Sequence, residues 1–244
     1  MIIKSLPQKG YAAIVIAPND PSLLVEEIDK LSESGIPILL INVDISTANR
    51  LCYVGCDYTQ SGVLAAEILA KSINREGEVA VLTLKDPVIA IEQRIIGFRQ
   101  ELSRYKDINI KQVIRFGRKT EGVYEEVVSL LKTNSQIDGI YVSFSALEQT
   151  AQAIIDSNLN KQIAVIGYDL SEEIYSYIKK DAITATICHE PFTQGYFGVK
   201  ILHNYLNRGL IPSSSIMYSK LEAIFSTNAK YYLNEQKHLE LFHL

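Results

Sequence analysis

Cys188, His189 and Glu190 place a potential nucleophile, a base and a carboxylate next to one another in the sequence. Catalysis by a thiol requires the base within hydrogen-bonding reach of the sulfur. These residues end an apolar segment that predicts a strand, and neighbouring side chains of a strand point to opposite faces. We therefore expect no catalysis at this run.

Short motifs that mark common enzyme classes are absent from the sequence. There is no GxSxG, HExxH or GxxxxGK[ST] pattern, and the glycines at 195 and 198 do not form a GxGxxG fingerprint. The three cysteines, Cys52, Cys56 and Cys188, are odd in number and form no CxxC pair. This argues against a disulfide framework or a zinc site and favours buried thiols in a reducing compartment. We expect a protein that is not an enzyme, with no cofactor and no metal.

The remaining chemistry is that of binding, and its residues follow the apolar runs of the chain. In a parallel sheet, ligands bind at the carboxyl ends of the strands. Loops are polar in most proteins, so this pattern fits a ligand site without requiring one. The polar residues that follow the runs are Asn19, Asp20, Asn42, Asp44, Asp57, Lys85, Asp86, Arg118, Ser143, Ser145, Asp169, His189 and Glu190.

The elements that must position these residues alternate along the chain. Short runs without polar alternation predict strands buried on both faces, and segments with helical spacing of apolar residues predict helices. The predicted strands are residues 12–17, 37–41, 51–54, 78–84, 108–115, 137–143, 163–168 and 182–188. The predicted helices are residues 22–35, 61–74, 90–104, 121–133, 147–157, 172–179 and 192–207. Residues 217–225 are strand-like and precede a helical end. This alternation predicts an α/β fold with mostly parallel sheets covered by helices.

Composition sets limits on the possible function. The 244 residues include 47% hydrophobic residues and carry a net charge of −4, which suits a folded domain and argues against a chain that binds polyanions along its length. No apolar run approaches the roughly 20 residues of a membrane span. The first ten residues lack the features of a secretory signal, so we expect a cytoplasmic protein without a membrane partner.

Four segments, in this order and spacing, resemble one family. They are Val54–Tyr58 followed by Gly62, Ala65 and Ala66; the Arg-x-x-Gly-Phe pattern of Arg94–Phe98; Val165–Leu170; and Ile187–Tyr196. Together they are similar to the type I periplasmic sugar-binding proteins and to the effector domains of LacI/GalR-family regulators. The resemblance extends from about Lys4 to about Leu233.

This resemblance implies two lobes joined by three crossing strands, with a sugar or related ligand held between them. It implies that residues 1–55 and 191–219 form the first lobe, and residues 56–190 and 220–244 the second lobe and tail. The family's ligand positions fall here on Asn42, Asp44, Arg94, Phe144, Asp169 and His189.

Two of these positions match the family. Arg94 corresponds to the arginine that binds ligand hydroxyls, and its fork can hold two neighbouring oxygens. Asp169 corresponds to the aspartate that accepts from a vicinal diol, although it could instead cap the helix that begins near Glu172.

Three positions depart from the family. Asn42 stands where aspartate is frequent, which suggests a different or less polyol-like ligand. Phe144 replaces a common asparagine or aspartate and could stack on the apolar face of a sugar. His189 replaces a frequent glutamine and would make affinity sensitive to pH.

Compared with this family, the sequence opens near the end of the first helix, at residues 2–6. Without the preceding strand, residues 12–17 would have an unpaired apolar edge, which is an aggregation liability. We therefore expect an incomplete first lobe, from an N-terminally truncated chain, a late start codon or a fragment. The DNA-reading head of a repressor would lie upstream.

Three hypotheses for function follow. The first is the effector-binding part of a LacI-type transcriptional regulator, a homodimer that contacts DNA only through the missing head. The second is the solute receptor of a sugar transporter or a sensor-kinase ectodomain. The third is an enzyme on the same fold that uses Asp169 or His189, since fold alone does not fix function.

Overall fold

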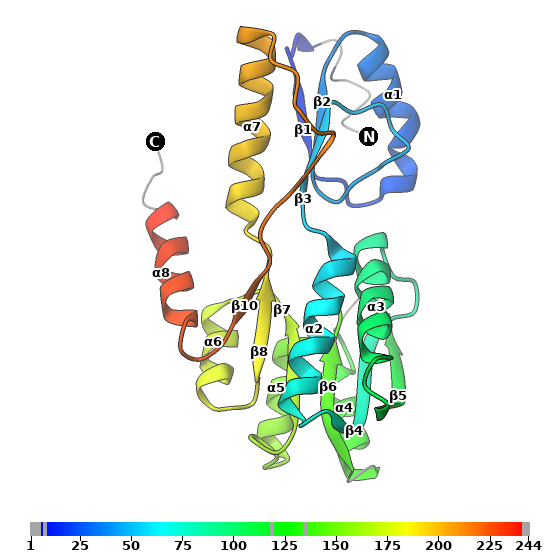
Figure 1. Ribbon diagram of the computed structural model, residues 1–244, viewed down its shortest axis with the longest axis vertical. Coiled ribbons are helices and arrows are strands. Elements are labelled where there is room, and N and C mark those ends of the chain that lie inside the picture. The colour runs from blue at the N-terminus through cyan, green and yellow to red at the C-terminus, as the bar shows by residue number, and fades with distance from the viewer. Residues whose placement is uncertain (1–5, 7–8, 118–119, 134–135, 241–244) are drawn as a thin grey trace. The chain divides into compact units, whose positions relative to one another are not determined.

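The computed structural model describes residue 6 and residues 9–117, 120–133 and 136–240 (Figure 1). It forms two compact units. Unit 1 is Met1–Asp57 with His189–Leu221, and unit 2 is Tyr58–Cys188 with Glu222–Leu244. The lobe boundaries expected from the sequence lie within two residues of these divisions.

Unit 1 is built on a sheet of four parallel strands. Their order is β1 (Ile14–Ile16), β2 (Ile38–Asn42), β3 (Cys52–Gly55) and β9 (Ile216–Tyr218). The helices of this unit are the 3-10 helix η3 (Pro21–Leu23), α1 (Val25–Glu33) and α7 (Pro191–Arg208).

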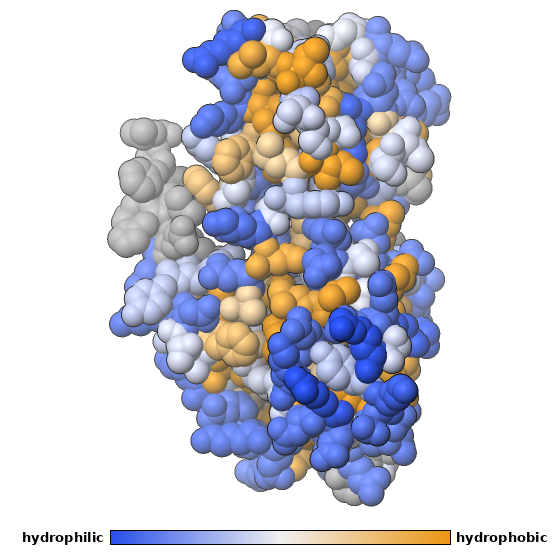
Figure 2. All heavy atoms as spheres, viewed as in Figure 1, coloured by the Kyte–Doolittle hydropathy of each residue, from blue (hydrophilic) through white to orange (hydrophobic). Residues whose placement is uncertain are grey.

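Alternate residues of the central strands in unit 1 pack against different helices. Ile38 and Leu40 of β2 join a cluster with Ile28 of α1, whereas Leu39 between them joins a cluster with Leu202 of α7. Both faces of the sheet are therefore covered. This explains why its strands read as continuous apolar runs. Figure 2 shows apolar side chains, in orange, exposed on unit 1 in the region of α7.

Unit 2 is built on a six-stranded sheet with helices on both faces. The strand order is β10 (Glu222–Ile224), β8 (Ala185–Cys188), β7 (Ala164–Tyr168), β6 (Ile137–Val142), β4 (Glu76–Leu84) and β5 (Asp107–Phe116). The helices are α2 (Tyr58–Ser72), α3 (Ile89–Leu102), α4 (Val123–Thr133), α5 (Leu147–Asp156), α6 (Glu172–Lys179) and α8 (Ala229–Glu240). Only β10 is antiparallel to its neighbour among these strands. Helices α4, α5 and α6 share one large core cluster with the sheet, and α2 and α3 lie side by side on the other face (Figure 1).

Two glycines allow α2 and α3 to approach closely. A Cβ at Gly62 of α2 would overlap the backbone of Arg94, and a Cβ at Gly97 of α3 would overlap the carbonyl oxygen of Thr59. Because backbone cannot move aside as a flexible side chain can, only glycine fits at this crossing. The two glycines thereby set the position of the helix that carries Arg94.

We expect Gly97→Ala to lower the free energy of unfolding by about 1–3 kcal/mol, because the added methyl group must push the two helices apart. Chemical denaturation monitored by circular dichroism measures this change. Gly195→Ala in α7 is the matched control, since nothing lies within 4 Å of its Cβ position. There the same substitution in a helix should stabilise by roughly 0.5–1 kcal/mol. Equal effects at both sites would contradict the close-packing explanation.

The structure confirms the predicted alternation of strands and helices and the α/β class, and it differs from the prediction in detail. The first predicted helix starts as the 3-10 turn η3, and α1 begins only at Val25. The strand-like segment at residues 217–225 is two three-residue strands, β9 in unit 1 and β10 in unit 2. The sequence does not reveal this division because each strand is too short to show a period.

Among the described residues, β1 pairs with β2 alone, in agreement with the expected edge position of this run. The expected helix end at residues 2–6 falls mostly outside the described residues, as does Arg118. Within the part of the chain that the structure describes, we find no helical segment with the length and apolar character that a membrane crossing requires.

Candidate ligand-binding site

Arg94 is the centre of a buried polar cluster in unit 2. It lies in the second turn of α3 and is only 7% exposed. Its guanidinium carbon lies 3.6 Å from the centre of the Tyr168 ring and 5.1 Å from that of Tyr58. Its Nη1 donates a hydrogen bond to the carbonyl oxygen of Ser143, at 3.2 Å. Stacking and hydrogen bonding together hold the planar guanidinium in one orientation.

The Nε atom of Arg94 is buried and has no hydrogen-bond partner among the described residues. A buried donor without a partner costs about 1–3 kcal/mol, and more when the group is charged. An acceptor oxygen from a bound molecule would remove this cost. The arginine is therefore positioned, charged and incompletely satisfied, as a ligand-binding group would be.

Thr83 supplies a second unsatisfied polar atom on the same face of the sheet. Its Oγ1 is buried without a partner in the described structure. Leu82 and Leu84 belong to the core cluster on the α4–α6 face, so Thr83 between them points to the α2–α3 face. Hydrogen bonds link its strand to Arg94. Arg94 donates to the carbonyl of Ser143, and the backbone N–H and the hydroxyl of Ser143 both donate to the carbonyl of Leu82, the residue before Thr83, each at 3.0 Å.

Tyr141 supports the ring of Tyr168, on which Arg94 stacks. The hydroxyls of Tyr141 and Tyr168 lie 2.8 Å apart, and Tyr141 stacks on Phe98 of α3 with ring centres 3.9 Å apart. Burial raises the pKa of Tyr141 well above its usual value, with smaller contributions from Tyr168. Tyr141 therefore stays protonated at neutral pH, and its hydrogen bond fixes the plane of the Tyr168 ring.

Asp169 comes directly after Tyr168 at the carboxyl end of β7, and its side chain is exposed. Its backbone has φ of 68°, in the left-handed region that aspartate and asparagine tolerate. The backbone is held there because its N–H donates to the carbonyl of Ile187 and its carbonyl accepts from the hydroxyl of Thr186. The alternative role as helix cap is wrong, since Ser171 caps α6 by accepting from the N–H of Ile174 at 3.0 Å.

Phe144 follows the carboxyl end of β6, and its side chain packs into the core of unit 2. It is 4% exposed and belongs to the core cluster on the α4–α6 face, where its ring is 5.8 Å from that of Phe116. Burial in this core lowers the free energy of an apolar side chain more than exposure to water at the end of a strand would. Its burial weakens the expectation that Phe144 stacks on a ligand, and we omit it from the contacts proposed below.

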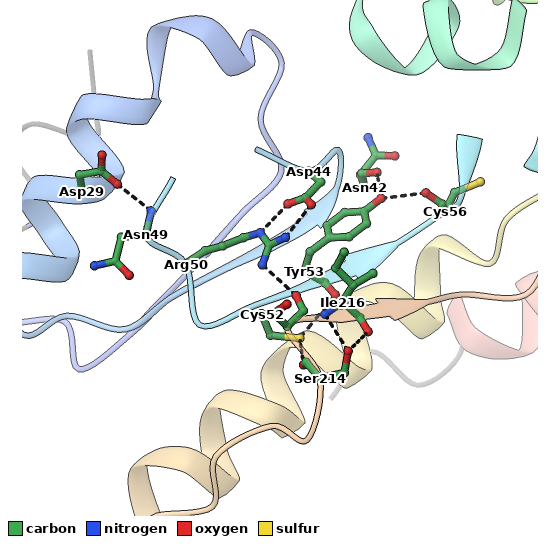
Figure 3. Close-up of polar contacts among 11 residues, drawn as sticks. Asp29, Asn42, Asp44, Asn49, Arg50, Cys52, Tyr53, Cys56, Ser214 and Ile216 are labelled. Atoms are coloured by element: carbon green, nitrogen blue, oxygen red, sulfur yellow. Dashed lines mark hydrogen bonds and ion pairs between the residues drawn. The ribbon is translucent and has the colours of Figure 1, made fainter. Parts of the chain in front are cut away.

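In unit 1, Asp44 is bound by an arginine that the sequence analysis missed. Its carboxylate oxygens lie 2.5 Å from Nε and 2.6 Å from Nη2 of Arg50, whose Nη1 donates to the carbonyl of Ser215 at 2.8 Å (Figure 3). These hydrogen bonds of Arg50 link the loop after β2 to Ser215, the residue before β9. Both carboxylate oxygens are used in this structural contact, which weakens the expectation that Asp44 binds ligand.

Asn42 ends β2 with φ of 67°, a backbone conformation that favours asparagine over most residues. Its carbonyl lies 2.7 Å from the hydroxyl of Tyr53, which is also 3.0 Å from the carbonyl of Cys56 (Figure 3). The strand end that carries Asn42 is thus fixed by a buried tyrosine. The side chain itself is half-buried.

His189 is held by two residues of unit 1. Gln194 in the first turn of α7 contacts both its ring and its carbonyl, and Ser219 contacts the carbonyl. The neighbouring Cys188 is buried, and this burial raises the pKa of its thiol to about 12. The thiol is therefore protonated at neutral pH, in line with the expectation that this run does not act as a nucleophile.

The structure places Arg94 and Asp169 in unit 2, where Arg94 stacks on Tyr168, the residue before Asp169, and it places Asn42, Asp44 and His189 in unit 1. The residues that sequence reasoning missed are Arg50, Thr83, Tyr141, Tyr168 and Gln194. One signal was available, because Tyr168 is a bulky aromatic residue in an otherwise small and aliphatic strand directly before Asp169.

A different cavity, of about 1040 Å³, lies at the amino-terminal ends of the strands of unit 2. Its lining includes Asn74, Lys106, Asp138, Lys161 and Asp181. Ligands of open parallel sheets bind at the opposite, carboxyl ends, and Asp181 is already paired with Lys161 at 3.2 Å. We therefore do not assign the ligand site to this cavity. Within the described ranges, no three His, Cys, Asp or Glu residues cluster as metal ligands would.

Comparison with known proteins shows the family to which the chain belongs. A family model described as "Periplasmic binding protein domain" matches residues 2–210. The Ribose import binding protein RbsB of Bacillus subtilis (strain 168) is 24% identical over 220 residues, which is 90% of this chain and 71% of that protein.

Two solved structures illustrate the range of related proteins. A periplasmic solute-binding protein of an ABC transporter from Actinobacillus succinogenes, with bound D-allose, is 26% identical with a TM-score of 0.85 and covers 95% of this chain and 84% of its own. A protein of Bacteroides fragilis described as a LacI transcriptional regulator is 22% identical with a TM-score of 0.83 and covers 95% and 81%. At 22% identity the latter likeness shows the fold alone.

Proposed function

Because the chain belongs to the periplasmic binding protein domain family, we propose that it binds a sugar or sugar-like molecule at the carboxyl ends of its strands. The observation that carries this proposal is Arg94, which is buried, is stacked on Tyr168 at the end of β7, and has an Nε atom without a partner among the described residues. Asp169 follows Tyr168 directly. A charged donor and a carboxylate acceptor form the pair that neighbouring hydroxyls of a sugar would engage. Asn42 and His189 remain the contacts predicted from unit 1.

We propose that the chain acts as the solute-binding component of a sugar transporter. The relatives support this role because they are named for ribose import and for solute binding by an ABC transporter. This was the alternative in the sequence analysis, and it now takes precedence over the regulator. The enzyme hypothesis gains no support, since the relatives are binding proteins.

The second candidate remains the effector-binding part of a LacI-type regulator, supported by the likeness in fold to the Bacteroides fragilis protein. The predicted cytoplasmic location and the DNA contact through a separate head belong to this candidate. Fractionation of cells that produce the protein from its own gene would separate the two roles. A regulator would remain with the cytoplasmic fraction, and a transport receptor would not.

A thermal-shift screen over pentoses, hexoses and their polyols tests the binding proposal. A ligand that binds only the folded protein stabilises it by about 2.7 kcal/mol at a concentration 100 times its dissociation constant. We expect at least one pentose or hexose to raise the melting temperature. If none does so at millimolar concentration while the chain remains folded, sugar binding is wrong.

The predicted homodimer of the regulator candidate has one suitable surface on α7. Phe192, Tyr196, Val199, Leu206 and Leu210 are between 45% and 63% exposed. The four that lie in α7, together with His203, repeat at intervals of four and three residues, which is the spacing of a two-helix seam, and Leu210 follows the end of the helix. These apolar residues leave roughly 500 Å² uncovered per copy, so two copies would bury about 1,000 Å² and reach the lower limit of a specific interface.

For this candidate we expect a dimer that Val199→Glu converts to a monomer, because the seam would then bury two unpaired carboxylates. Size-exclusion chromatography with light scattering measures the mass of the particle. Lys230→Glu, which changes the charge of an exposed residue outside the α7 seam, is the control and should leave the mass unchanged. A wild-type monomer at all concentrations would contradict the dimer and favour the transport receptor.

A further inference from the structure

A buried glutamine holds the side chain of His189 in unit 1. His189 follows β8, and Gln194, only 2% exposed, points back to it from the first turn of α7. The Nε2 atom of Gln194 lies 2.7 Å from the carbonyl oxygen of His189, 3.1 Å from its Nδ1 and 3.2 Å from the hydroxyl of Ser219. The hydroxyl of Ser219 in turn lies 2.9 Å from the same carbonyl oxygen.

The backbone carbonyl fixes the orientation of the Gln194 amide. A carbonyl oxygen only accepts hydrogen bonds, so the amide atom 2.7 Å away must be the NH₂ group and not the amide oxygen. Ser219 donates its one hydroxyl hydrogen to this carbonyl and therefore accepts from the amide. The three contacts of the NH₂ group are then donations from its two hydrogens, so one hydrogen is shared between two acceptors.

The protonation of the His189 ring follows from this orientation. Because the NH₂ group of Gln194 donates, the ring nitrogen facing it, Nδ1, must present its lone pair. A neutral imidazole carries one proton, which must then be on Nε2. Placing a proton on Nδ1 would require the amide to flip and to lose its bonds to the carbonyl of His189 and to Ser219.

We propose that Gln194 is a positioning residue that fixes His189 as the Nε2–H tautomer, so that His189 binds an acceptor oxygen of the ligand as a donor. The role toward a ligand rests on the proposed sugar-binding function, whereas the fixed tautomer does not. His189 and Ser219 lie close to the points at which the chain passes from one unit to the other, at residues 188–189 and 221–222. The cluster therefore also ties these two segments to α7.

Nitrogen-15 NMR of the histidine rings, recorded without any sugar, tests the tautomer directly. The wild-type His189 should show an unprotonated Nδ1 and a protonated Nε2, with the resonances assigned by their loss in His189→Asn. In Gln194→Met, which keeps the length of the side chain and removes the amide, the two ring nitrogens should average between tautomers. Gln149→Met is the matched control, since Gln149 is also a helical glutamine and its buried Oε1 has no partner in the described structure.

Isothermal titration with D-ribose as the probe tests the consequence for binding. We expect Gln194→Met to weaken D-ribose binding about tenfold and Gln149→Met to leave it unchanged. A proton on Nδ1 in the wild type, or an unchanged tautomer in Gln194→Met, would overturn the proposal. If Gln194→Met does not fold, Gln194→Glu serves instead, because a carboxylate only accepts hydrogen bonds and should move the ring proton to Nδ1.

The two proposals can fail separately. Absence of D-ribose binding in the wild type and in every variant would count against the ligand role of His189 and against D-ribose as a ligand, while the NMR result would still decide the positioning role. An unchanged affinity in Gln194→Met together with a changed tautomer would refute the ligand role alone.

Discussion

Arg94→Ala is expected to weaken binding of any sugar found in the screen by a factor of about 100 or more. Hydrogen bonds to charged groups contribute about 1.5–3 kcal/mol each, and the guanidinium can offer more than one to neighbouring oxygens. The buried position adds to the effect, because water would have to replace the arginine next to Tyr168 and Ser143. Isothermal titration measures the loss.

The Arg94 test needs a control for folding and for charge. Arg99→Ala removes an exposed arginine from the same helix and should leave affinity unchanged. Arg94→Lys keeps the charge but loses Nε and the fork, and it should still weaken binding at least tenfold. Thermal melts of each variant separate loss of stability from loss of binding. Full affinity in a folded Arg94→Ala protein would place the ligand elsewhere.

Asp169→Asn is expected to weaken sugar binding by a factor of about 10–100. The carboxylate can accept from two vicinal hydroxyls, and replacing it with an amide loses the charge and one acceptor. Asparagine tolerates the left-handed backbone at φ of 68°, whereas alanine would add strain of roughly 1 kcal/mol or more. Asparagine therefore isolates the chemistry of the side chain from that of the backbone.

Asp181→Asn is the matched control for Asp169. Asp181 also has a left-handed backbone, with φ of 56°, and also lies in unit 2, but it precedes β8 instead of following a strand. Its ion pair with Lys161 is exposed and contributes little to stability. Sugar affinity should be unchanged in Asp181→Asn. Equal losses in both variants would show an effect of net charge and not of a contact.

The secondary structure of this chain could be predicted because its strands are buried on both faces. Leu39 and Leu40 of β2 face different helices, so both must be apolar, and such a run stands out from the helical spacing around it. The strands β9 and β10 could not be predicted in the same way. With three residues each they have no measurable period, and only pairing with β3 and β8 defines them.

The site could be predicted only in part. Asp169 and Arg94 could be predicted as ligand contacts because each belongs to a segment with a recognisable pattern. For Phe144 the pattern gives the position in the chain but not the face of the sheet on which its side chain packs. Tyr141 and Tyr168 were missed because the hydrogen bond between their hydroxyls joins two different strands. The two residues are 27 positions apart in the sequence, so no local pattern shows the contact.

The sequence by itself determined the order of the elements and the strand ends that carry polar residues, because both depend on the local spacing of apolar side chains. Tertiary structure alone decided which polar groups are already satisfied. Both carboxylate oxygens of Asp44 accept hydrogen bonds from Arg50, and the Nδ1 atom of His189 faces the amide of Gln194. In contrast, Nε of Arg94 is buried without a partner among the described residues. The physical reason is that hydrogen bonds form between residues that packing brings together, and whether a buried donor remains for a ligand depends on all of its neighbours at once.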